Sequence, residues 1–136
     1  MKTKVAVVGS RTFKNYKFLS EQLTEIFKKL SYEDVIIVSG GSGGADTLAE
    51  QYANDNGLDT RIIVADWNDM SEPCVIKQNR YGTYNALAGF RRNKIVVDEA
   101  DLIIAFWDGI SRGTADTIKK AKEEDKHLIV IDTNNI

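Results

Sequence analysis

The chain has 136 residues, of which 43% are hydrophobic and 28% charged, and its formal net charge is −2. This size and composition are typical of a soluble globular protein, so we expect residues 1–136 to form a single domain. An isoelectric point near 5.4 disfavours broad nucleic-acid binding, and the longest apolar runs are too short to span a bilayer. The single cysteine, Cys74, cannot form an internal disulfide, which favours a reducing, cytoplasmic setting.

Five short apolar runs along the chain are typical of β-strands. The first three are continuously apolar and show no alternation with polar residues, which favours a parallel sheet covered on both faces. The predicted strands are residues 4–8, 35–38, 61–64, 101–106 and 127–131.

Helical periodicity separates these runs. In the first helical segment, apolar residues recur at spacings of three and four and mark a stripe that faces the core. The predicted helices are residues 16–30, 45–56, 87–99 and 114–124. Strand and helix therefore alternate four times before a last strand. This order predicts an α/β protein with a Rossmann-like, doubly wound, parallel five-stranded sheet and helices on both faces.

Residues 65–84 differ from the rest of the chain. They contain the only proline, Pro73, together with Trp67 and two tyrosines, and they show no clear periodicity. A connection of this length is unusual in a compact domain, and such loops commonly serve as lids, binding loops or partner surfaces. We therefore expect a loop here that acts as a lid or an interface.

Three predicted strands are followed by loops that combine glycine with serine or threonine. In a doubly wound sheet, ligands bind at the carboxyl ends of the strands, near the switch point in strand order. We expect the loops at residues 9–12, 39–46 and 107–114 to converge there. Glycine allows a close approach of backbone N–H groups to a phosphate.

The loop at residues 39–46, SGGSGGAD, gives the strongest signal for phosphate binding. It lacks the Gly-Lys-Ser/Thr of a P-loop, and it is not a G-x-G-x-x-G motif on the first strand. It therefore predicts phosphate or ribose binding without ATPase chemistry. Asp46 can accept a ribose hydroxyl or act as a general base, or it can simply stabilise the N-terminus of the following helix.

The other two loops carry weaker signals. Ser10 and Thr12 can donate to phosphate oxygens and Arg11 can bind one bidentately, or Ser10 or Thr12 can instead cap the next helix. Gly113 and Thr114 resemble an anion cradle at a helix start, unless Thr114 serves only as an N-cap.

Aromatic and basic residues near these loops have two interpretations each. Aromatic side chains can stack on a nucleobase, or they can pack at the boundary between loop and core; they are Trp67, Tyr81, Tyr84 and Trp107. The basic cluster of Arg91, Arg92 and Lys94 forms either a solvated helix face or part of a ligand site.

Taken in order, these motifs resemble the SLOG (Smf/DprA–LOG) superfamily, and most of all its small YspA-like branch. Ser42 replaces an alanine of the branch pattern, and Gly43 replaces a residue that is usually basic. Residues 65–84 are also longer than the matching segment of the branch. The motifs are G-S/x-R-x-F (residues 9–13), SGGAxGAD-x-LA (39–49), a tryptophan (67), AGxxRN (88–93), and a D-x-hydrophobic-AF strand followed by a Gly-Thr helix start (101–114).

The resemblance implies a domain that binds a nucleotide or a nucleotide-derived signalling molecule, ADP-ribose-like or cyclic, as in bacterial and phage conflict systems. We expect it to sense or sequester this ligand without a cofactor or metal, away from membranes, as a homodimer or higher homo-oligomer. One alternative is a nucleotide-processing hydrolase of the LOG phosphoribohydrolase type. A second alternative is a DprA-like single-stranded nucleic-acid binder, which the acidic isoelectric point disfavours.

LOG-type hydrolases pair an arginine with a glutamate in a PGGxGTxxE motif. Arg92 matches the arginine, but Thr117 stands at the glutamate position. An oxocarbenium-like transition state needs a nearby anion or base, so the missing carboxylate favours binding over hydrolysis. If the protein is an enzyme that cleaves an N-glycosidic or phosphate bond, the candidate catalytic residues are Asp46, Arg92, Asp108 and Asp116.

The expected ligand-binding residues come from the three loops and from the AGxxRN motif. We also expect Gly44→Asp to abolish ligand binding and leave the fold intact, because it places a carboxylate in a phosphate cradle. The expected residues are Gly9, Ser10, Arg11, Thr12, Ser39, Gly40, Gly41, Ser42, Gly44, Asp46, Arg92, Asn93, Asp108, Gly109, Ser111, Gly113 and Thr114.

Overall fold

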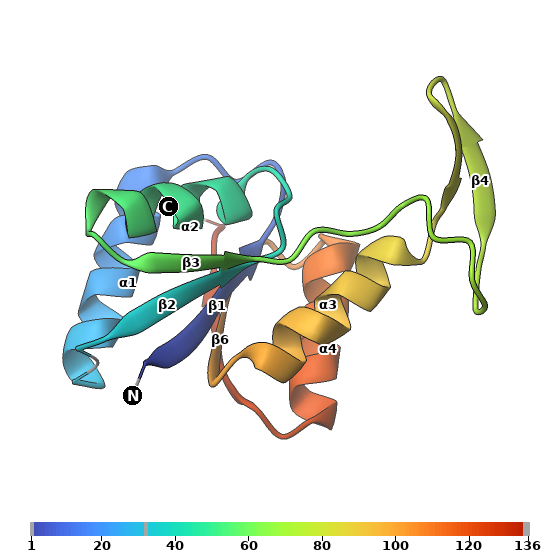
Figure 1. The fold of residues 1–136 in the computed structure, drawn as a ribbon. Helices are drawn as coiled ribbons and strands as arrows, with labels where there is room; N and C mark the ends of the chain where they lie inside the picture. Colours follow the sequence, from blue (N-terminus) through green and yellow to red (C-terminus); the bar gives the residue numbers. More distant parts are fainter. Residues whose placement is uncertain (1, 32, 135–136) are drawn as a thin grey trace.

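Seven strands and four helices form the part of the chain that the computed structural model describes, residues 2–31 and 33–134 (Figure 1). In chain order they are β1 (Thr3–Gly9), α1 (Tyr16–Lys29), β2 (Val35–Ser39), α2 (Ala45–Asp55), β3 (Asp59–Ile62), β4 (Ile76–Asn79), β5 (Gly82–Asn85), α3 (Ala88–Glu99), β6 (Leu102–Trp107), α4 (Arg112–Glu123) and β7 (His127–Asp132). Five strands pair in parallel in the order β3-β2-β1-β6-β7. The predicted Rossmann-like, doubly wound sheet is therefore confirmed.

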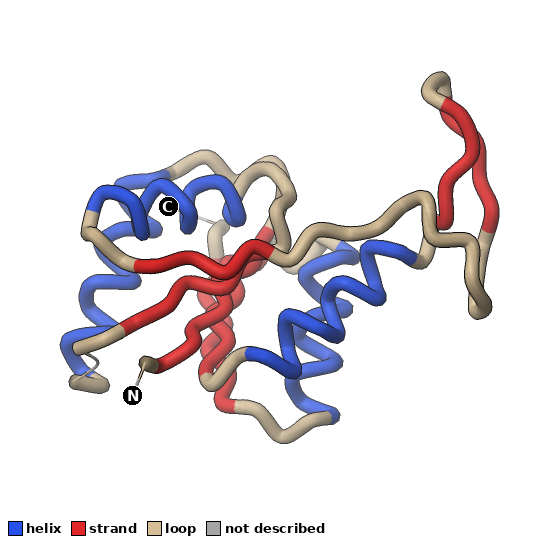
Figure 2. Tube along the Cα trace, viewed as in Figure 1, coloured by secondary structure: helices blue, strands red, loops and turns tan. Residues whose placement is uncertain are grey.

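The two faces of the sheet are covered by different pairs of helices (Figure 2). Successive side chains of β1 point to opposite faces, so Val5 and Val7 pack with α1 and α2, whereas Ala6 and Val8 pack with α3 and α4. Because α1 follows β1 on one face and α4 follows β6 on the other, the loops after these two strands diverge. This divergence is the switch point at which a doubly wound sheet leaves a crevice. None of the described helices is long and apolar enough to cross a membrane.

The third strand begins earlier than the sequence predicts and is not buried. The prediction was residues 61–64, but β3 covers Asp59–Ile62 and all its residues are exposed. It is an edge strand that pairs with β2, so the expectation of cover on both faces is wrong here. The apolar residues Ile62 and Val64 instead flank Gly41, where an ideal Cβ would lie 3.2 and 2.9 Å from their methyl carbons.

Residues 65–84 do not form the predicted irregular loop. They include an antiparallel hairpin, β4–β5, that projects from the main domain on an extended segment (Figure 1). Both faces of the hairpin are largely exposed, so neither face has to be apolar. The two strands, IKQN and GTYN, therefore need no alternation of apolar and polar residues. For this reason the sequence pattern did not predict the hairpin. We call residues 68–86 the arm.

The base of the arm is fixed by two side chains. Asn85 is fully buried; its Oδ1 accepts from the Val75 and Leu87 N–H groups at 3.2 and 3.0 Å, and its Nδ2 donates to the Asp69 carbonyl at 2.9 Å. Arg91, on α3, donates to backbone carbonyls of the arm and pairs with the Asp69 carboxylate at 3.4 Å. Arg91 therefore anchors the arm to α3 and is not a lining residue of the two cavities described below.

Asn85→Ala should loosen the arm without unfolding the main domain. The substitution removes three side-chain hydrogen bonds and leaves buried backbone groups without those partners, a loss of about 1–3 kcal/mol. Amide hydrogen exchange should therefore accelerate about 5- to 150-fold in the arm and stay unchanged in β1 and β6. Asn79→Ala is the control, because Asn79 accepts one bond, from the Tyr81 N–H at the exposed tip. Equal acceleration by both variants would contradict this role of Asn85.

Candidate functional site

The three glycine-bearing loops meet, as predicted, around one cavity of about 410 Å³ at the carboxyl ends of the strands. The sequence did not single out Val8, Val96 or Ile110, which also line it, and it treated Thr117 only as a departure from the hydrolase pattern. That these residues bind a ligand stays a prediction. The expected residues that line the cavity are Gly9, Ser10, Arg11, Thr12, Gly40, Ser42, Asp46, Arg92, Asn93, Asp108, Ser111, Gly113 and Thr114.

The other expected residues, Ser39, Gly41, Gly44 and Gly109, are not among those that line the cavity. Buried Ser39 shapes the second loop, because its Oγ donates to Glu50 at 2.8 Å and accepts from the Gly41 N–H at 3.2 Å. Gly41 and Gly109 have φ values of +70° and +82°, in the left-handed region that favours glycine. These residues shape the loops and do not face the cavity as lining residues.

Gly44 is a packing residue. An ideal Cβ at Gly44 would lie 2.2 Å from the Ser10 carbonyl oxygen, and its φ is +66°. The start of α2 therefore presses directly on the first loop. The expectation that Gly44→Asp would leave the fold intact is wrong, since any side chain there collides with backbone.

The first loop does not serve as a helix cap. The N-cap of α1 is Asn15, whose Oδ1 accepts from the Phe18 N–H at 3.0 Å. Ser10 and Thr12 instead bond to each other, with their hydroxyl oxygens 2.8 Å apart. The capping alternative for these two residues is therefore wrong, and both hydroxyls lie at the cavity.

Asp46 and Arg92 form the charged centre of the cavity. Asp46 is only 6% exposed, and its Oδ2 accepts from the Ser42 N–H at 3.0 Å. Burial raises the pKa of the Asp46 carboxyl to about 6, against the opposing effects of the Ser42 N–H and of Arg92. The Arg92 guanidinium donates through Nη1 to the Gly40 carbonyl at 2.7 Å and to Ser42 Oγ at 3.2 Å. Burial lowers the pKa of Arg92, but a guanidinium stays charged in proteins.

Asn93 connects this centre to the third loop. It is buried, its Oδ1 accepts from Arg92 Nε at 3.1 Å, and its Nδ2 donates to the Gly113 carbonyl at 3.3 Å and to Asp116 at 3.0 Å. The Arg-Asn pair of the AGxxRN motif thus ties α3 to the second loop and to α4. This network fixes the guanidinium in one orientation.

The third loop places the first turn of α4 at the cavity. The N-cap is Ser111, whose side chain accepts from the Thr114 N–H, so the interpretation of Thr114 as N-cap is wrong. Gly113 and Thr114 lie in the first helical turn and line the cavity. The N–H groups of a first turn have no partners within the helix, which makes this turn suited to an anion.

The candidate carboxylates lie in different surroundings. Asp108 lines the cavity, but its Oδ1 accepts from the Ile110 and Ser111 N–H groups at 2.8 Å each. These bonds hold the pKa of Asp108 below its ordinary value. Asp116 pairs with Lys120 at 2.6 Å and is not among the lining residues, so the structure does not bring this catalytic candidate to the cavity. Among these three candidates, Asp46 is the carboxyl that both lines the cavity and has a raised pKa.

Thr117, at the position where hydrolases of the LOG type carry glutamate, is buried and lines the cavity. Its hydroxyl donates to the Gly113 carbonyl at 3.2 Å. Thr117 therefore contributes an uncharged side chain to the cavity lining.

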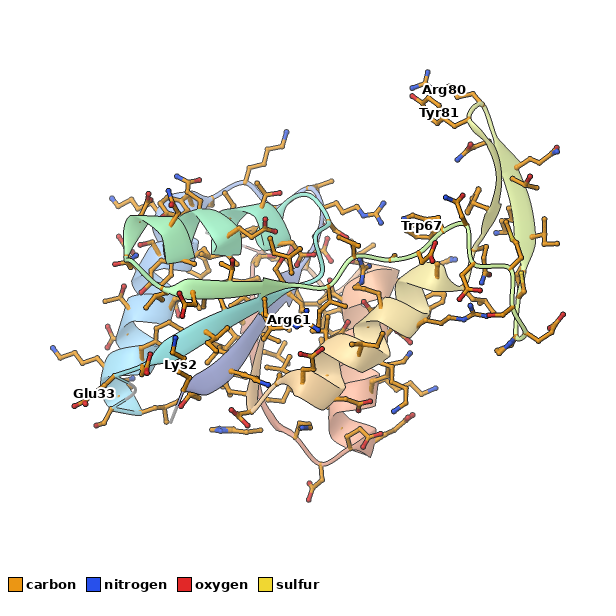
Figure 3. All side chains as sticks on the ribbon, viewed as in Figure 1. Lys2, Glu33, Arg61, Trp67, Arg80 and Tyr81 are labelled. Atoms are coloured by element: carbon orange, nitrogen blue, oxygen red, sulfur yellow. The ribbon has the colours of Figure 1, made fainter. Side chains whose placement is uncertain are left out.

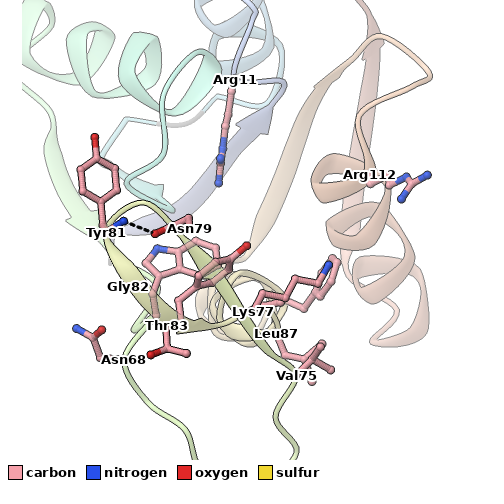
Figure 4. Close-up of a pocket in the computed structure, with 14 residues that line it drawn as sticks. Arg11, Asn68, Val75, Lys77, Asn79, Tyr81, Gly82, Thr83, Leu87 and Arg112 are labelled. Carbon is pink, nitrogen blue, oxygen red and sulfur yellow. Dashed lines mark hydrogen bonds between the residues drawn. The ribbon is translucent and has the colours of Figure 1, made fainter.

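A second cavity, of about 740 Å³, lies between the arm and the main domain (Figure 4). Three of the four aromatic residues that the sequence singled out line it: Trp67, Tyr81 and Tyr84. The fourth, Trp107, is half-buried elsewhere, and its Nε1 donates to the Ser111 carbonyl at 3.1 Å.

Comparison with known families supports the resemblance drawn from the motifs. Residues 3–69 match the family described as YspA, cpYpsA-related SLOG, so the resemblance to the SLOG superfamily is confirmed. The match includes the first two loops and ends inside the arm. No curated protein sequence matches the chain.

Solved structures of similar fold come from bacteria and from an alga. DNA processing protein A (DprA) of Streptococcus pneumoniae has a TM-score of 0.70 at 25% identity, over 98% of this chain and 52% of that one, so this chain spans about half its length. DprA of Helicobacter pylori, described for its single-stranded DNA binding mode, has a TM-score of 0.67 at 21% identity, over 98% of this chain and 67% of that one. The Moco carrier protein of Chlamydomonas reinhardtii has a TM-score of 0.57 at 15% identity, over 96% of this chain and 76% of that one.

Proposed function

We propose that this chain, a SLOG-type Rossmann-like domain, binds a nucleotide or a nucleotide-derived signalling molecule in the 410 Å³ cavity, and so senses or sequesters it. One observation carries the proposal. Three loops and α3 surround the buried Asp46 and the half-buried Arg92 beside the first turn of α4. The guanidinium and the helix N-terminus suit a phosphate, whereas Asp46 can accept a sugar hydroxyl. The volume is in the usual range for small-molecule sites.

The similar structures suggest two kinds of ligand, a nucleic-acid polymer and a small molecule. One is described as binding single-stranded DNA and another as a carrier of Moco, so this fold serves both a polymer and a small molecule. The net charge of −2 and the buried carboxyl favour a small molecule here, because polymer binding depends on the neutralisation of many phosphates. We further propose that residues 1–136 act as one domain and that the protein assembles as a homo-oligomer.

Gly113→Asp should abolish nucleotide binding and keep the fold. An ideal Cβ at Gly113 meets no atom within 4 Å, and an acidic residue in the first turn of α4 stabilises the helix. The new carboxylate stands where we place the phosphate, and repulsion at about 4 Å predicts a loss of affinity of about 100-fold or more. Calorimetric titration and thermal shift with mononucleotides, cyclic nucleotides and ADP-ribose measure this loss.

Gly43→Asp is the matched control. Gly43 is also unobstructed and, like Gly113, exposed, but it is not among the lining residues of the cavity. Screening by solvent should limit its effect to about threefold. An equal effect of the two variants would contradict the proposed phosphate position. Salt-sensitive binding of oligonucleotides, with no response to any small nucleotide, would favour a single-stranded nucleic-acid binder instead.

Hydrolysis of a nucleotide is a second candidate function, and the position of Asp46 favours it. A carboxyl with a pKa of about 6, close to Arg92, has the properties of a general base at neutral pH. Release of free base or phosphate over many turnovers, absent in Asp46→Asn, would support catalysis. Recovery of intact ligand after denaturation of the complex would support binding alone.

A further inference from the structure

The cavity beside the arm adjoins the proposed phosphate site. Arg11 lines both cavities, and Ser111 lines the first while the next residue, Arg112, lines the second. Figure 4 shows Arg11 extending from the main domain toward the arm. A single ligand can therefore contact the loops with one end and the arm with the other.

The chemistry of the second cavity differs from that of the chain as a whole. Its lining combines three cations, Arg11, Lys77 and Arg112, with aromatic side chains, and none of the described residues that line it is acidic. The chain carries a net charge of −2, so this absence of carboxylates is a local property. Cationic and aromatic groups together suit a ligand that is both anionic and aromatic.

Trp67 lies at the base of the arm (Figure 3). An ideal Cβ at Gly89 would lie 3.2 Å from Trp67 Cη2 and 3.6 Å from Arg92 Nη2, so the indole packs on α3 next to the charged centre. Its ring meets Tyr84 edge-on, with centroids 6.0 Å apart. The Trp67 carbonyl accepts from the Asn85 N–H at 2.8 Å, yet 37% of the residue is exposed. A ring that is fixed and still accessible is suited to stacking.

We infer that the arm forms a nucleobase subsite, in which the base of a nucleoside phosphate stacks on Trp67 while its phosphate lies at the loops. This inference rests on the proposed function. The family match ends at residue 69, so nearly all of the arm lies outside the matched region. Base–aromatic stacking of about 1–3 kcal/mol predicts that the base adds about 5- to 150-fold to affinity.

The test compares four nucleoside monophosphates (AMP, GMP, CMP and UMP) with ribose 5-phosphate, which has the same sugar and phosphate but no base. We expect at least one nucleotide to bind 5- to 150-fold more tightly than ribose 5-phosphate. Trp67→Leu should lower the affinity for that nucleotide to the affinity for ribose 5-phosphate. The affinity for ribose 5-phosphate should stay unchanged. Retained binding of ribose 5-phosphate shows that the variant is folded.

Fluorescence gives a second readout that needs no change at Trp67. The chain has two tryptophans, and Trp107→Phe leaves Trp67 as the single one. The nucleotide should quench its emission, whereas ribose 5-phosphate should not. Equal affinity for both ligands, without quenching, would overturn the subsite and leave the proposed function standing. Binding of neither ligand would overturn the subsite, and the proposed function would fall with it if cyclic nucleotides and ADP-ribose also fail to bind.

Discussion

Gly44→Ala should lower the free energy of unfolding by about 3 kcal/mol and the melting temperature by about 10 °C. An ideal Cβ at Gly44 would lie 2.2 Å from the Ser10 carbonyl oxygen and 2.5 Å from backbone carbons of Arg11. These are backbone atoms, which cannot swing aside as a flexible side chain does, and alanine is strained at a φ of +66°. The first two loops would separate, and the bond from the Ala45 N–H to the Ser10 carbonyl, 3.1 Å, would be lost.

Gly43→Ala provides the comparison for this prediction. The two glycines are neighbours in one loop, but an ideal Cβ at Gly43 meets no atom within 4 Å. The unfolding free energy of Gly43→Ala should therefore stay within about 0.5 kcal/mol of the wild type. Urea or thermal unfolding of both variants measures the difference. Equal midpoints would contradict the close packing of α2 on the first loop.

Asp46 should contribute a fall in the free energy of unfolding as the pH rises from 4 to 8. Burial raises the pKa of Asp46 from its ordinary value of 3.8 to about 6, so the folded protein holds this proton more tightly than the unfolded chain does. The stability that the proton contributes is complete below pH 3.8 and is lost as the pH rises through about 6. The difference between the two pKa values corresponds to about 3 kcal/mol above pH 7.

Asp46→Asn isolates this contribution. Asparagine keeps an oxygen that can accept from the Ser42 N–H but has no charge to bury. Relative to the wild type, the variant should gain about 2 kcal/mol in unfolding free energy between pH 4.5 and pH 8, measured by urea unfolding at each pH. Asp66→Asn is the control, because Asp66 is exposed, and its curve should run parallel to that of the wild type. A parallel curve for Asp46→Asn would contradict the raised pKa of Asp46.

The sequence predicted the convergence of the loops because topology leaves few alternatives. Once strands and helices alternate and the crossovers are right-handed, every strand points the same way. Loops that follow strands then share one edge of the sheet, which brings Gly9, Ser42 and Gly113 together from distant parts of the chain. One helical step rotates a side chain by about 100°, which agrees with Thr117 lining the cavity while Asp116 does not.

The arm and the roles of single residues were not predictable in this way. The strands of the arm are exposed on both faces, so burial imposes no period on their sequence. Asn85 and Arg91 are fixed by contacts between segments that no local pattern relates.

The sequence by itself determined the layered fold, the switch point and the edge at which the glycine loops gather, because these follow from the order and direction of the elements. Only the tertiary structure decided the part that each residue plays there. Gly44 has the sequence context of a phosphate ligand and is instead the residue that lets α2 touch the first loop. Asp46 has the pattern of a helix-terminal carboxylate, and burial raises its pKa to about 6 in spite of the nearby Arg92. Close approach and burial depend on the position of atoms in space, which no spacing along the chain specifies.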